Sequence, residues 1–230
     1  MRTRHREPHR FGFTLVELLI VVAIIAIIAA AALPNLLASR LTANEASAIG
    51  TLRTVCSAQS QARNRVAVDF DSDGQGEFLY MAELSGNVNL RGLATPLDPA
   101  AVSLSIGQVS NSAVNHSGYH FAMYLPDVAA VGVLEDPNGG KAAPATVDAD
   151  YCETFFVCYA WPTSVNSSGR RAFAVNESGD MVQSDNVATA YSGTGLMPAF
   201  DAAYTVAGDM TSGFNIAGPA VDGGTWKPVN

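Results

Sequence analysis

The stretch at residues 11–29 reads FGFTLVELLIVVAIIAIIA, and the apolar run continues to Leu33. The last 16 residues of this run, from Leu18 onward, are all apolar, and Glu17 is the one charge between Phe13 and Leu33. As an α-helix, these 21 residues reach about 30 Å, the thickness of a bilayer's hydrocarbon core. The stretch therefore predicts a membrane-spanning helix. Because an acid inside a membrane is costly, Glu17 is expected to have a role there.

The residues before this run are basic. They include Arg2, Arg4, Arg6 and Arg10, with Glu7 as the one acid. A basic start before an apolar run is also typical of secretory signal peptides. Their apolar region usually spans only about 7–15 residues and ends at a small-residue cleavage site, a pattern that this run lacks. The positive-inside rule predicts that the arginines stay in the cytoplasm and that the rest of the chain faces outward.

The order Gly12, Phe-Thr-Leu-Val-Glu at 13–17 and an uninterrupted apolar helix resembles the N-terminus of type IV prepilins and the related pseudopilins. The resemblance implies that residues 1–12 are a leader, that prepilin peptidase cleaves between Gly12 and Phe13, and that the new Phe13 amine is N-methylated. It also implies that Glu17 pairs with the Phe13 amine of a neighbouring subunit. The alternative is a single-pass anchor with a stray acid.

The same resemblance implies an α+β, type IV pilin-like fold. A long N-terminal helix would pack against an antiparallel β-sheet of about four strands. Residues 13–34 would form the transmembrane and filament-core half of the helix, and residues 35–68 its amphipathic half. Residues 69–230 would form the globular head.

The expected helix covers roughly residues 13–66, with one interruption. Pro34 lacks an N–H group and predicts a helix break or bend at that point. Beyond it, one face carries apolar residues, namely Leu37, Leu41, Ala48, Leu52, Val55 and Ala62. The opposite face carries polar ones, namely Arg40, Asn44, Glu45, Arg53, Gln61 and Arg63. This spacing is typical of an amphipathic helix that buries its apolar stripe under a sheet.

An acidic loop, DFDSDGQGE at residues 69–77, follows the helix. Asp69, Asp71 and Asp73 with the following glycine match the first half of a calcium-binding loop. The twelfth position is Tyr80 instead of the glutamate that an EF-hand requires. Glu77 or Glu83 would have to substitute in another geometry. Calcium is therefore possible but not required, and the alternative is a solvated Asp/Gly turn. No other cofactor is expected.

Alternating apolar residues predict strands near 119–125, 153–161, 171–175 and 180–183, the last two joined as a hairpin. Apolar residues on both faces of 153–161 indicate a central, doubly covered strand. Residues 85–117 are expected to be mostly loop. The tail from 186 is expected to be irregular, with short strands around 225–229, and to cover the sheet edge.

Three cysteines, Cys56, Cys152 and Cys158, allow at most one internal disulfide. Cys152 and Cys158 would lie about 20 Å apart in a continuous strand, too far to pair. Cys56 could pair with either of them, or all three could be free.

Composition bears on the function class. Residues 1–12 hold four of the 13 basic and one of the 21 acidic residues, so without them the net charge is −11. No basic stripe remains, which argues against a nucleic-acid partner. His116 and His120 have no neighbouring catalytic motif, so the chain is not expected to be an enzyme.

The expected function is that of a structural subunit of a type IV pilus or related filament. The resemblance implies three kinds of partner, namely other pilin-like subunits, prepilin peptidase and an inner-membrane assembly platform. It implies a single-pass precursor in the bacterial inner membrane and then an extracellular or periplasmic filament. The alternatives are a pseudopilin of a type II secretion system, or an anchored calcium-dependent binding module that does not polymerise.

Overall fold

The computed structural model describes residues 12–141 and 144–229. Its elements are the helices α1 (Leu15–Asn64), α2 (Met81–Leu84), α3 (Leu104–Gly107) and α4 (Ala149–Thr154), the 3-10 helices η1 (Pro144–Thr146) and η2 (Met210–Ser212), and eight strands. The chain divides into two compact units, the first ending at Arg40 and the second beginning at Leu41. The expected leader, residues 1–12, lies outside the described residues except for Gly12.

The sequence predicted a break or a bend at Pro34, and helix α1 runs through this residue without a break. A proline removes one intrahelical hydrogen bond, and the flanking alanines and leucines are strong helix formers that tolerate this loss. The helix ends at Asn64, before residue 68, because Val66 adopts a positive φ of 51°. The Ala67 N–H then donates to the Ala62 carbonyl, which closes the last turn.

The second unit contains one antiparallel sheet in the order β1-β2-β3-β5-β6-β7-β8, with β4 also pairing with β3. The strands are β1 (Val109–Ser110), β2 (Ala113–His116), β3 (Tyr119–Pro126), β4 (Gly132–Leu134), β5 (Val157–Pro162), β6 (Ala172–Asn176), β7 (Met181–Ser184) and β8 (Trp226–Pro228). The α+β layout is the predicted one, but the sheet has eight strands instead of about four. Of the four additional strands, β8 lies where the sequence predicted a short strand around 225–229. The other three, β1, β2 and β4, have only two to four residues and so carry little alternation for a sequence pattern to detect.

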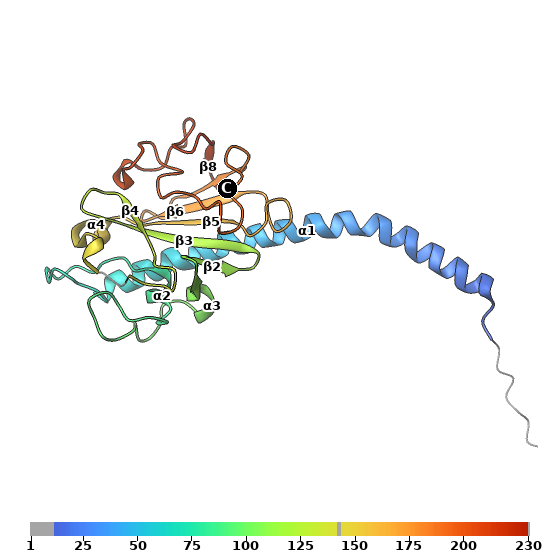
Figure 1. The fold of residues 1–230 in the computed structure, drawn as a ribbon, viewed down its shortest axis with the longest axis horizontal. Helices are drawn as coiled ribbons and strands as arrows, with labels where there is room; N and C mark the ends of the chain where they lie inside the picture. The colour runs from blue at the N-terminus through green and yellow to red at the C-terminus, as the bar shows by residue number, and fades with distance from the viewer. Residues whose placement is uncertain (1–11, 142–143, 230) are drawn as a thin grey trace, which may run out of the picture. The chain divides into compact units, whose positions relative to one another are not determined.

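The sheet is covered on both faces (Figure 1). One apolar cluster joins α1 residues such as Leu52 and Val55 to Phe121 and Phe173. The other joins the opposite face of the strands, including Tyr159, to the C-terminal segment through side chains such as Tyr191, Tyr204 and Trp226. All six residues of β5 are buried as a result.

One predicted strand is shorter than expected. Residues 153 and 154 belong to α4, and the strand begins at Val157 instead. Asp148 caps α4 by accepting a hydrogen bond from the Tyr151 N–H at 3.0 Å, which favours a helical start. The turn of helix carries Asp150 and Glu153.

Candidate functional site

The apolar side chains of the first unit are exposed. Phe13 is 92% exposed, and the leucine, isoleucine and valine residues of α1 from Leu15 to Leu37 are all more than half exposed. Helix α1 is the one described helix that is long and apolar enough to cross a membrane, a test that signal sequences also pass. Apolar surface on this scale needs lipid or protein around it.

Glu17 lies at the start of this helix and caps it. Its Oε2 accepts hydrogen bonds from the Thr14 N–H and hydroxyl, both at 2.8 Å, and the Glu17 N–H donates to Thr14 Oγ1 at 3.2 Å. This is the reciprocal arrangement of a capping box. The carboxylate is exposed. Its pairing with a neighbouring Phe13 amine stays a prediction, since one chain does not test it.

The acidic loop after α1 gathers three of its four predicted ligands. One carboxylate oxygen from each of Asp69, Asp71 and Asp73 lies within 4.8 Å of the others. The Asp73 and Gly74 N–H groups both donate to Asp69, at 3.1 Å each. Gly74 has a φ of +93°, as the tight turn at the sixth position of such a loop requires.

Glu77, the fourth predicted ligand, is engaged elsewhere. It is buried, and its Oε1 accepts a hydrogen bond from the Phe70 N–H at 2.8 Å. Its Oε2 lies 3.3 Å from Arg91 Nη2 in an ion pair. Burial raises the pKa of Glu77, while Arg91 opposes the rise. The structure thus uses Glu77 to hold the loop and Arg91 in place.

A second acidic group was missed by the sequence analysis. Asp150 and Glu153 from α4 each place a carboxylate oxygen within 4.8 Å of Asp71 and of each other. Nothing in the sequence indicates that α4, some 80 residues further along the chain, lies beside this loop. Asp71 therefore belongs to both groups.

The three cysteines are free. Cys152 and Cys158 are fully buried, and Cys56 is half-buried on α1. Burial raises the pKa of Cys152 to about 12. These thiols are apolar core residues with little thiolate character.

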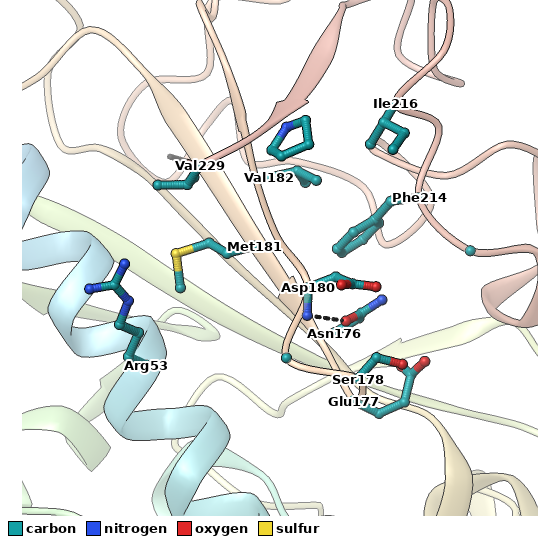
Figure 2. A pocket seen from close by; sticks show the side chains of 13 residues that line it. Arg53, Asn176, Glu177, Ser178, Asp180, Met181, Val182, Phe214, Ile216 and Val229 are labelled. Carbon is teal, nitrogen blue, oxygen red and sulfur yellow. Dashed lines mark hydrogen bonds between the residues drawn. The ribbon is translucent and has the colours of Figure 1, made fainter.

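The second unit also contains a hollow of about 640 Å³ beside the β6–β7 turn (Figure 2). Arg53, Glu177, Asp180 and Phe214 contribute to its walls, and the Asp180 N–H donates to Asn176 Oδ1 at 3.0 Å. Its described lining contains neither histidine nor cysteine.

Comparisons with known proteins identify the N-terminal segment. Residues 8–33 match the model described as the prokaryotic N-terminal methylation motif. A stretch of 34 residues is 71% identical to the type IV wide pilus major component PilA4 of Thermus thermophilus. That match covers 15% of this chain and 26% of the relative, so the chain spans about a quarter of that relative's length. No solved structure matches. The chain thus carries a prepilin-type processing motif on an apolar N-terminal helix.

Proposed function

We propose that this chain is a structural subunit of a type IV pilus or a related filament. In this proposal prepilin peptidase cleaves between Gly12 and Phe13, the Phe13 amine is methylated, and the subunit assembles through its N-terminal helix. The observation that carries the proposal is Glu17. It is a carboxylate inside a prepilin-type apolar helix whose neighbouring side chains are exposed.

The assembly step follows from electrostatics. Before assembly the precursor is anchored in the inner membrane, with its head outward. A carboxylate among apolar helices is stabilised when a positive group pairs with it, and the Phe13 amine of an arriving subunit supplies that charge. The pair sets the register of neighbouring helices because no other ionisable group lies between Phe13 and Leu33. The exposed aliphatic residues of α1 then exchange lipid for the helices of other subunits.

The test distinguishes the charge of Glu17 from its role as a cap of the helix. Glu17→Gln keeps an oxygen that accepts the Thr14 hydrogen bonds but removes the charge, and Leu18→Ala is a control in the same segment. Each variant is expressed in cells that carry the native assembly machinery. Sheared filaments and membranes are probed for the subunit, and the N-terminus is examined by mass spectrometry.

We expect wild type and Leu18→Ala to begin at methylated Phe13 and to appear in filaments. Glu17→Gln should remain in the membrane fraction while its incorporation into filaments falls at least tenfold, an order-of-magnitude expectation for losing one buried charge pair. Unchanged incorporation of Glu17→Gln would refute the pairing. A wild-type N-terminus other than Phe13 would refute the processing.

A pseudopilin of a type II secretion system remains the second candidate, because the same N-terminal motif serves both classes. Deleting the gene separates the two. Loss of surface filaments supports a pilus subunit, and loss of protein secretion with filaments intact supports a pseudopilin.

A further inference from the structure

The acidic loop and α4 form one continuous carboxylate cluster, made of Asp69, Asp71, Asp73, Asp150 and Glu153. Two groups of three carboxylates, each with oxygens within 4.8 Å of one another, share Asp71. Coulomb repulsion between carboxylates at this spacing favours a cation between them. An acidic cluster on a surface is common, however, and does not by itself indicate a ligand.

Glu153 supplies the independent observation. It is only 5% exposed, yet its Oε1 is buried with no hydrogen-bond partner among the described residues. Most buried polar atoms in proteins have a hydrogen-bond partner. A buried carboxylate oxygen without one indicates that a ligand completes its interactions. Desolvation, with Asp73 and Asp71 adding repulsion, raises the pKa of Glu153 to about 6. The Glu153 carboxylate belongs to the group that contains Asp71 and Asp150, and its side chain also interacts with Asp73.

The chemistry of the donors selects the ligand. All five side chains offer carboxylate oxygens, and neither sulfur nor imidazole is among them. Calcium takes six to eight oxygen ligands in flexible geometry, whereas magnesium demands a near-ideal octahedron. The loop also has the glycine turn of a calcium loop, at Gly74.

We propose that this cluster binds Ca²⁺, with Asp71 as the shared ligand, Asp69 and Asp73 from the loop, and Asp150 and Glu153 from α4. The α4 carboxylates take the role that a glutamate at the twelfth loop position has in an EF-hand. Glu77 is outside the ligand set because Phe70 and Arg91 hold it. The ion would tie the loop that follows α1 to the helical turn that precedes β5. This inference does not depend on filament assembly.

The experiment titrates CaCl₂ into the chelator-treated full-length protein in detergent micelles. Calorimetry measures the dissociation constant. Tryptophan fluorescence follows the thermal unfolding of the second unit, in which Trp161 and Trp226 are fully buried. The variants are Asp71→Asn on the exposed loop and Glu153→Gln. Asp185→Asn is the control, because it removes an exposed carboxylate outside the cluster.

We expect the wild-type dissociation constant to be about 1 mM or tighter, as in extracellular calcium modules, and calcium to raise the melting temperature. Asp71→Asn and Glu153→Gln should each weaken binding at least about tenfold. Asp185→Asn should leave the dissociation constant within about twofold.

Three results would overturn the proposal. The first is neither heat nor a melting shift for the wild type at about 10 mM calcium. The second is wild-type affinity in Glu153→Gln, which would leave a site made by the loop alone. The third is wild-type affinity in Asp71→Asn, which remains informative if Glu153→Gln does not fold.

Discussion

Replacing Arg91 with methionine removes a buried cation from between two buried acids. The Arg91 side chain is 1% exposed, and its guanidinium lies 3.3 Å from Glu77 Oε2 and 3.4 Å from Glu83 Oε1. It also donates to the Phe78 carbonyl and lies over the ring of Tyr80, 5.7 Å from the centroid. Methionine fills a similar volume without charge, so the cost is mostly electrostatic.

The magnitude follows from the partner that is left behind. Glu83 is fully buried, and breaking a buried ion pair by removing one partner costs about 3–5 kcal/mol. The head should stay folded, because domains of this size have about 5–15 kcal/mol of stability. Its melting temperature should fall by about 6–20 °C, at roughly 2–4 °C per kcal/mol.

The loss should depend on pH. Burial raises the pKa of Glu83 above its usual 4.5, and Arg91 opposes that rise. Without Arg91 the pKa of Glu83 in the folded state rises further. The folded variant therefore binds more protons than its unfolded chain. Its stability is therefore fully present below the unfolded pKa and is lost as pH increases through the folded pKa. The destabilisation relative to wild type should be smaller at about pH 5 than at about pH 8.

Urea unfolding followed by tryptophan fluorescence measures the free energy of unfolding at each pH. The signal reports on the second unit, because the chain's two tryptophans, Trp161 and Trp226, both lie there. Adding Glu83→Gln to Arg91→Met should recover part of the loss, since it removes the unpaired charge. Lys141→Met is the control, because its pair with Asp136 is partly exposed and should cost less than about 1 kcal/mol. An Arg91→Met cost below about 1 kcal/mol at neutral pH, or one equal at both pH values, would refute the reasoning.

Two further predictions concern the second unit. Glu45→Gln should lower the free energy of unfolding by about 1–2 kcal/mol, because Glu45 Oε2 accepts hydrogen bonds from Arg171 Nε and Nη2 at 2.8 and 2.7 Å. The expected cost is modest because Arg171 is partly exposed. The same urea unfolding measures it, and an unchanged midpoint would contradict the prediction. A thiol reagent should modify Cys56 slowly in the native protein and all three cysteines in denaturant without reductant, because Cys152 and Cys158 are fully buried. Mass spectrometry counts the modified thiols, and a single reactive cysteine in denaturant would indicate a disulfide instead.

Elements whose pattern repeats along the chain are predictable from the sequence. The alternating residues of β3 and β6 and the long apolar run of α1 are local periodicities that a short window contains. A tertiary contact that overrides such a pattern is not predictable in this way. Glu45 was assigned to the exposed face of α1, yet it is 7% exposed because Arg171 and the backbone N–H groups of residues 170 and 171 satisfy its carboxylate. Residues 153–154 were predicted to begin a strand because apolar residues follow them. The local pattern does not show that Asp148 caps a helix there.

The sequence alone determined the processing motif, the apolar helix and the position of Glu17 within it, because these are consecutive residues that a local pattern contains. Tertiary structure alone decided how the charges of the second unit are paired. Glu45 meets Arg171 across 126 positions of the chain, Arg91 lies between Glu77 and Glu83, and Asp71 meets Glu153. Burial removes water from these groups, so each must find a partner wherever the fold places one. For Glu153 Oε1 the described residues provide none, and the proposed calcium ion would take that place.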